Sequence, residues 1–228
     1  MDFSGLPDRL ALIRETISAG QQAGGWAHSV EIVAVTKGHG PEAVRAAAAA
    51  GLMAVGENRV QEALAKQEAA GDLPVRWHLI GTLQRNKVRQ AVGRFALIHS
   101  VDRFDLAQEI SRRLTPAERQ PVLVQVNCSN EPQKGGVEPT GLADLLDQVA
   151  GLPGLEVRGL MTMAAFDADT GEQHRAFGLL RRLRDEATAR GRCGSELSMG
   201  MSGDFRVAVE EGATMVRVGT LLFGERRP

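Results

Sequence analysis

The chain has 228 residues, of which 43% are apolar and 24% are charged, and its formal net charge is −1. These proportions are typical of a globular protein that can bury a sizeable core, and they exclude a disordered chain. A net charge this close to zero gives no electrostatic reason to expect binding to nucleic acid.

The cysteines and the apolar runs exclude further classes of protein. The two cysteines, Cys128 and Cys193, have the spacing of neither a metal site nor a disulfide framework, so we expect neither. No apolar run is long enough to span a bilayer, and the acidic first five residues do not resemble a signal peptide. We therefore expect a soluble, cytoplasmic protein that does not bind membranes.

Short β-rich runs alternate with helical patterns along the chain, after a first helical pattern near residues 7–23. The predicted strands lie near residues 31–37, 52–56, 75–80, 96–100, 121–127, 156–162, 196–199 and 214–218. The helical patterns between them lie near residues 41–50, 58–70, 84–92, 103–114, 139–150, 172–190 and 203–211. This alternation indicates a parallel sheet with right-handed crossovers.

Eight strands are the number that closes a (β/α)8 barrel, a fold of about 250 residues. We therefore predict the α/β class and a single TIM barrel domain over residues 1–228. Residues 219–228 are too few for a full eighth helix. We expect the N-terminal helix to complete the outer ring in its place.

Lys37 ends the first predicted strand on the same face as Val33 and Val35. One interpretation is a lysine whose ammonium extends into solvent at the end of the strand. The other is an amine held at the edge of the core, where burial lowers its pKa and prepares it to form a Schiff base with a carbonyl. The strand alone does not choose between them.

The predicted ends of strands seven and eight carry polar residues that suit an anion. In such barrels a phosphate is often bound by the loops after these two strands. Ser202 precedes a helix expected to begin near residue 203, so it is either an N-cap or an anion ligand. Gly219 and Thr220 follow strand eight, and glycine allows a backbone N–H to approach an oxyanion closely. Arg217 shares a strand face with Gly219, and its charge needs either a carboxylate or a ligand as partner.

An amine on strand one and a phosphate site at strands seven and eight would face each other across the barrel mouth. Pyridoxal 5′-phosphate (PLP), which carries an aldehyde and a phosphate, would satisfy both sites. A phosphorylated sugar or ketose would also satisfy them, and this reasoning alone does not choose.

Seven motifs occur in an order that resembles the PLP homeostasis protein family, also called the YggS or PROSC family. The resemblance extends from about residue 7 to residue 226. The motifs are AVTK at 34–37, GENRVQE at 56–62, WHLIG at 77–81 followed by LQRNK at 83–87, HSVD at 99–102, GLMT at 159–162, LSMGMS at 197–202 and VRVGT at 216–220.

The resemblance implies a PLP-binding barrel of the alanine racemase N-terminal type, known as PLP fold type III. It implies that Lys37 carries the Schiff base and that Arg217 matches the arginine beside the pyridine nitrogen in related racemases. The other residues that it assigns to the cofactor are Ser202, Gly219 and Thr220 at the phosphate and Asn58, His78, Met161 and Ser198 along the pocket. Residues 133–136 depart from the Lys-Ser-Gly pattern of the family, which puts the conformation of that loop in question.

The resemblance further implies a protein that buffers PLP or delivers it to PLP-dependent apo-enzymes, and a monomer. The sequence has no tyrosine to serve as the racemase base. Because it ends at Pro228, soon after the predicted barrel, we expect no second domain. Two alternatives stay open: a weak racemase-like enzyme that uses Lys37 and His78 or water, and a Schiff-base aldolase or phosphosugar enzyme. Basic residues near 85–89 suit a second PLP site less well than they suit a solvated helix face.

Overall fold

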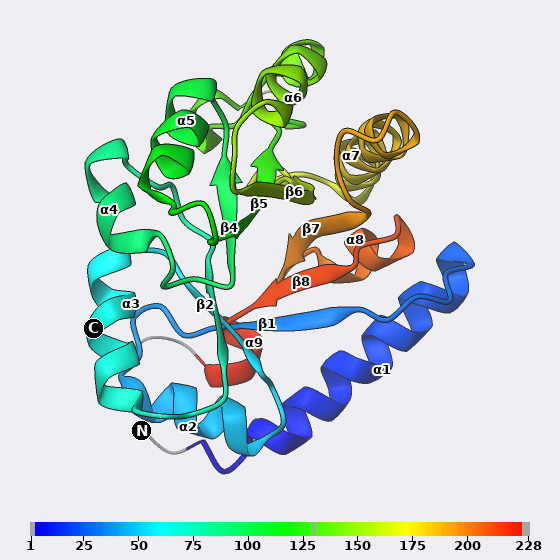
Figure 1. Ribbon diagram of the computed structural model, residues 1–228. Helices are drawn as coiled ribbons and strands as arrows, with labels where there is room; N and C mark the ends of the chain where they lie inside the picture. The colour runs from blue at the N-terminus through cyan, green and yellow to red at the C-terminus, as the bar shows by residue number, and fades with distance from the viewer. Residues whose placement is uncertain (1–2, 130, 225–228) are drawn as a thin grey trace.

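The computed structural model describes residues 3–129 and 131–224. In this part of the chain, eight parallel strands close into a barrel in the order β1 to β8 (Figure 1), which confirms the predicted (β/α)8 fold. The prediction of one domain over residues 1–228 includes residues 1–2, 130 and 225–228, which lie outside the described residues. The strands are β1 (Glu31–Val35), β2 (Ala54–Glu57), β3 (Arg76–Leu79), β4 (Leu97–Val101), β5 (Gln120–Gln125), β6 (Leu155–Met161), β7 (Glu196–Met201) and β8 (Met215–Val218).

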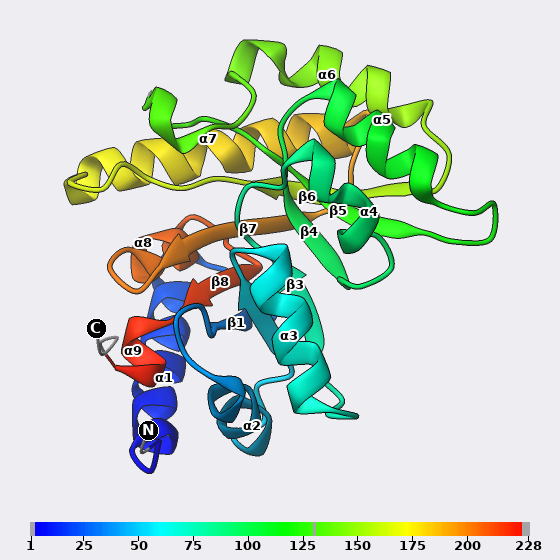
Figure 2. The same ribbon diagram turned by 90° about the vertical axis from the view of Figure 1, so that its left-hand side faces the viewer.

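Helices surround the barrel, and α1 lies against α8 and α9 (Figures 1 and 2), so the N-terminal helix completes the outer ring as expected. Within the described residues, no helix combines the length and the apolar character needed to cross a membrane. Short 3-10 helices lie at Arg85–Lys87, Pro132–Lys134 and Pro139–Gly141. The α-helices are α1 (Leu6–Gly24), α2 (Pro41–Ala49), α3 (Val60–Ala70), α4 (Val88–Ala91), α5 (Phe104–Arg113), α6 (Leu142–Ala150), α7 (Thr170–Ala189), α8 (Phe205–Glu210) and α9 (Thr220–Phe223).

Two apolar layers hold the strands in place. The outer layer joins the strands to the helices through alternate strand residues such as Ala34 and Val216. The inner layer fills the barrel and forms the floor beneath its mouth. It consists of Val33, Ala54, Leu97, Leu123, Met161 and Met215, with the half-buried Ile80 and Met163 packed against it.

The first strand is shorter than expected, because β1 ends at Val35 and not at residue 37. Thr36 begins a tight turn, since its carbonyl accepts a hydrogen bond from the N–H of His39 at 3.0 Å. Lys37 therefore lies in a turn beyond the strand. The alternation of faces still holds, because Val35 and Lys37 line the same cavity.

A bulge in β7 shapes the mouth on the opposite side. Ser198 pairs with Met215 and Met201 pairs with Arg217, so β7 takes three steps where β8 takes two. Gly200 lies in this bulge with a φ of 88°, and a Cβ there would lie 2.6 Å from a side-chain carbon of α8. Glycine is required here both by the left-handed backbone and by the close approach of the helix.

Candidate functional site

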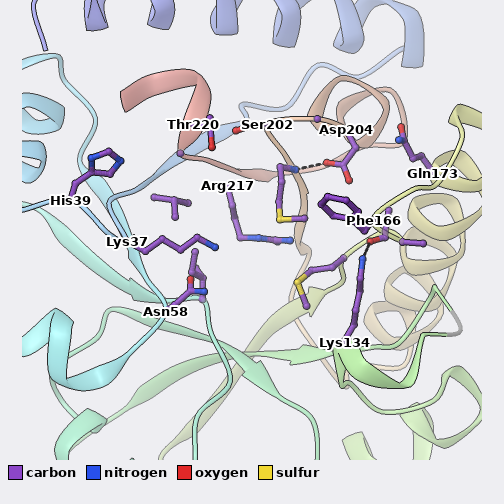
Figure 3. Close-up of a pocket in the computed structure, with 18 of the residues that line it drawn as sticks. Lys37, His39, Asn58, Lys134, Phe166, Gln173, Ser202, Asp204, Arg217 and Thr220 are labelled. Atoms are coloured by element: carbon purple, nitrogen blue, oxygen red, sulfur yellow. Dashed lines mark hydrogen bonds between the residues drawn. The ribbon is translucent and has the colours of Figure 1, made fainter. Parts of the chain in front are cut away.

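A cavity of about 360 Å³ opens at the carboxyl ends of the strands (Figure 3). This is the end of a (β/α)8 barrel at which active sites are built. Six of the nine residues that the sequence assigned to a cofactor line it, and they come from both sides of the mouth. These six are Lys37, Asn58, Ser202, Arg217, Gly219 and Thr220.

Lys37 contributes an amine to this cavity. Its side chain is half-buried, and Figure 3 shows it reaching across the cavity toward Arg217. Asn58, which follows β2, lies beside it and lines the same space. This placement favours the second lysine interpretation, an amine held at the edge of the core, over an ammonium that extends away into solvent.

Arg217 contributes a buried cation. Its side chain lies on β8, and the residue is only 4% exposed. Nη1 donates to the Ser198 hydroxyl at 2.6 Å and Nη2 donates to the Thr162 carbonyl at 2.9 Å, so both of these acceptors are neutral. Burial lowers the pKa of the guanidinium to about 10, while the negative charge of Asp204 acts to raise it. The guanidinium therefore stays charged at neutral pH in a place where no carboxylate of the described residues forms an ion pair with it.

A hydrogen-bonded chain crosses the barrel interior from Arg217 to β3. The Ser198 hydroxyl lies 2.9 Å from Nδ1 of His99, and Nε2 of His99 lies 3.0 Å from Nδ1 of His78. Burial lowers the pKa of both imidazoles, to about 4 for His78 and well below the usual value for His99. Both rings are therefore neutral at pH 7. If the Ser198 hydroxyl donates to His99, which then donates to His78, each of these protons has an acceptor.

Three predicted pocket residues lie beneath the cavity and do not line it. His78 and Ser198 belong to the hydrogen-bonded chain described above. Met161 belongs to the inner apolar layer and is 1% exposed. Of these three, Ser198 contacts a cavity residue through its hydrogen bond with Arg217.

The loop between β7 and α8 lines the cavity opposite Lys37. Ser202, for which an N-cap was one of two interpretations, does not cap the helix, because α8 begins at Phe205 and Asp204 occupies the N-cap position. The Asp204 carboxylate instead accepts a hydrogen bond from the N–H of Met201 at 2.5 Å, which folds the loop back on itself. Ser202 is thus left to face the cavity beside Thr220 (Figure 3).

The chain matches the alanine racemase, N-terminal domain family over residues 10–227. A pyridoxal phosphate homeostasis protein of Aquifex aeolicus is 45% identical over 223 residues, which cover 96% of this chain and 98% of that protein. One of Pseudomonas aeruginosa is 46% identical over 219 residues, which cover 95% of this chain and 92% of that protein. The chain belongs to the pyridoxal phosphate homeostasis protein family.

A solved structure supports the same assignment. PipY of Synechococcus elongatus, with PLP bound, is 39% identical and superimposes with a TM-score of 0.84. The match covers 96% of this chain and all of that one. The family resemblance that the motifs indicated is therefore confirmed over nearly the whole length.

In this member of the pyridoxal phosphate homeostasis protein family, the cavity is also lined by residues that the sequence did not predict, among them three titratable side chains and one aromatic ring. Lys134 reaches the cavity from the loop after β5 and donates to the Ala164 carbonyl. The sequence hint to Lys134 was that residues 133–136 depart from the family pattern. Gly135 and Gly136, which follow Lys134, both have positive φ and turn the loop. The other three carry no comparable signal. They are His39, Phe166 and Asp204.

Proposed function

We propose that the chain holds PLP in the mouth cavity as a Schiff base on Lys37, and that it buffers this cofactor or delivers it. The observation that carries the proposal is that the Lys37 amine and the buried Arg217 guanidinium reach into one cavity (Figure 3). Support also comes from relatives named pyridoxal phosphate homeostasis proteins and from the PipY structure that contains PLP.

The size and the donors of the cavity fit this cofactor. About 360 Å³ lies within the range of small-molecule sites. At Gly219 an added Cβ would lie 3.1 Å from the Val35 carbonyl oxygen, so a side chain has little room there and the backbone can approach a ligand closely. We assign Gly219 and the hydroxyls of Ser202 and Thr220 to the phosphate.

When bound, PLP supplies an aldehyde that condenses with an amine, so that Lys37 Nζ joins the aldehyde carbon and one water is released. We assign Arg217 to the ring nitrogen, to which it can donate a hydrogen bond. With a pKa of about 10, Arg217 gives up no proton at neutral pH, so that nitrogen stays unprotonated and the ring is a weak electron sink. We propose that Asn58 lies beside the ring. We further propose that His78, Met161 and Ser198 lie beneath the ring and support the residues that contact it.

The surroundings of the cavity favour a carrier without strong catalytic activity. A racemase needs acid–base groups on both faces of the cofactor. His78, the candidate for the second face, is buried, bonds to His99 and does not line the cavity, and its pKa is lowered to about 4. The sequence also contains no tyrosine.

A weak racemase-like enzyme is the second candidate. It is favoured by the match to the alanine racemase, N-terminal domain family and by Lys134 and Asp204, which bring further titratable groups to the cavity. This candidate predicts that deuterium from solvent enters the α position of added amino acids. A carrier leaves the α proton in place.

The proposal is tested by an absorbance spectrum of the PLP-loaded protein before and after borohydride, followed by peptide mapping. We expect a chromophore that borohydride reduces to a pyridoxyl group on Lys37. Lys37→Ala should lose this adduct and keep its fold, because the residue lies in a turn at the rim. Lys134→Ala, which alters the other lysine of the cavity, should keep the adduct. A protein that cannot be loaded would contradict the proposal and redirect the search to phosphorylated sugars.

We also propose that residues 1–228 form one cofactor-binding domain that acts as a monomer in the cytoplasm and loads PLP-dependent apo-enzymes. Light scattering of the loaded protein should give the mass of one chain, 24.5 kDa. Delivery should appear as activity of an added apo-enzyme that rises faster than the spontaneous release of PLP allows.

A further inference from the structure

Lys37 occupies the second position of a tight turn from Thr36 to His39. The N–H of His39 donates to the Thr36 carbonyl at 3.0 Å and closes the turn. Gly38, in the third position, has a φ of 77°, as a type II turn requires. The direction in which the Lys37 side chain leaves the backbone therefore depends on how this turn is held.

A buried ion pair holds the turn from behind. Glu57 at the end of β2 is fully buried, and Lys66 of α3 is 8% exposed. Lys66 Nζ lies 2.6 Å from Glu57 Oε1 and donates to the Thr36 carbonyl at 2.7 Å. The Thr36 hydroxyl donates to the same Oε1 at 2.5 Å, and the Thr36 N–H donates to the Gly56 carbonyl at 3.1 Å. Every polar group of Thr36 is thus engaged by β2, by α3 or by the turn itself.

These contacts fix the peptide bond that leads into Lys37. The carbonyl of Thr36 and the N–H of Lys37 belong to one rigid plane, so an ammonium that holds the carbonyl also sets the orientation of the next residue. A buried ion pair is in itself weak support for folding, because apolar residues of similar volume can replace it without loss of stability. Its convergence on Thr36 suggests a different role.

We propose that Glu57 and Lys66 are positioning residues, which hold the turn so that the Lys37 amine faces the carbonyl of a ligand in the cavity. This rests on the proposed function of Lys37. In the step that they would assist, the neutral Lys37 amine would attack the aldehyde carbon and form a C=N bond. Its two N–H protons would pass to the aldehyde oxygen, which would leave as water. A reacting amine displaced by about 1 Å can lose on the order of a hundredfold in rate.

The test separates positioning from folding and from phosphate binding. The variant Glu57→Leu/Lys66→Met removes both charges together and leaves neither one buried alone. Arg59→Met is the matched control, because Arg59 pairs with Glu62 at the exposed start of the same helix. Three quantities are measured for each protein: the rate of covalent linkage to PLP, the affinity for 4′-deoxypyridoxine 5′-phosphate, which lacks the aldehyde, and the urea midpoint of unfolding.

We expect the double variant to keep its affinity for the analogue and to form the linkage at least tenfold more slowly. It should still unfold cooperatively, with a urea midpoint lowered by no more than about 1 M, because the buried Thr36 hydroxyl loses its acceptor. The control should match the wild type in all three. A double variant that forms the linkage at the wild-type rate would overturn the positioning role. A wild-type protein that binds neither PLP nor the analogue would instead overturn the proposed function, and the positioning role with it.

Thr36→Val covers the case in which the double variant does not fold. It removes the hydroxyl that bonds to Glu57 and leaves the ion pair in place. We expect the linkage to form about threefold more slowly while the affinity for the analogue is unchanged. An unchanged rate in this variant would also overturn the positioning role.

Discussion

Removing the hydroxyl of Ser198 should cost the folded protein far more than the loss of one ordinary hydrogen bond. Ser198→Ala deletes the acceptor of Arg217 Nη1 at 2.6 Å and the partner of His99 Nδ1 at 2.9 Å. A hydrogen bond to a charged group contributes about 1.5–3 kcal/mol, and a buried polar group left without a partner costs about 1–3 kcal/mol. We therefore expect the free energy of unfolding to fall by about 3–4 kcal/mol.

Urea denaturation measures this change, and Ser111→Ala is the control. Ser111 is also buried, but its hydroxyl donates only to the Pro153 carbonyl, at 2.7 Å, so its loss should cost about 1 kcal/mol. With a slope of about 3 kcal/mol per molar urea, Ser198→Ala should lower the midpoint by about 1 M and Ser111→Ala by roughly a third of that. Equal shifts in the two variants would refute the account of Arg217 as a buried cation held by the Ser198 hydroxyl.

Two further predictions concern pH and the bulge in β7. The folded protein holds His78 with a pKa of about 4, against about 6.5 in the unfolded chain, so the unfolded state binds more protons below pH 6.5. The contribution of His78 to the free energy of unfolding should be complete above pH 6.5 and should fall by about 3 kcal/mol as the pH drops to 4. If the urea midpoints of His78→Asn and of the wild type varied equally with pH, this prediction would be contradicted. Gly200→Ala introduces a Cβ at a φ of 88° and 2.6 Å from Ala208, and should destabilise by about 3 kcal/mol or more, measured by urea denaturation. Gly191→Ala, with a φ of 67° and open space around the Cβ, should cost about 1 kcal/mol, and equal costs would rule out the steric argument.

The fold and the reactive rim could be predicted because their signals are local. Alternating strand and helix patterns specify a barrel, and a barrel assigns chemistry to the ends of its strands. Lys37 and Arg217 were recognisable as charged residues at the ends of apolar runs, and both reach into the cavity. Gly219 was recognisable from its place directly after the last strand.

The depth of a side chain inside the barrel could not be predicted in this way. The family resemblance assigns His78 and Ser198 to the pocket, but the height of a side chain in the barrel depends on the tilt and stagger of neighbouring strands, which no single strand encodes. They therefore lie one level below the cavity, where they bond to His99. Loop residues are harder still, because contacts distant in sequence, such as that of Lys134 with Ala164, decide where they point.

The two ends of the cavity are anchored to separate parts of the barrel. Lys37 is tied to β2 and α3 through Thr36, whereas Arg217 is tied to the end of β6 and to β7 through Thr162 and Ser198. Because different residues hold Lys37 and Arg217, the β6–β8 side can be redesigned to bind a ligand of another shape while the contacts that hold the Lys37 turn stay unchanged. Under the proposed function of Lys37, the barrel would offer protein engineers a covalent capture scaffold in which the residues around the ligand can be changed without changing those that hold the lysine.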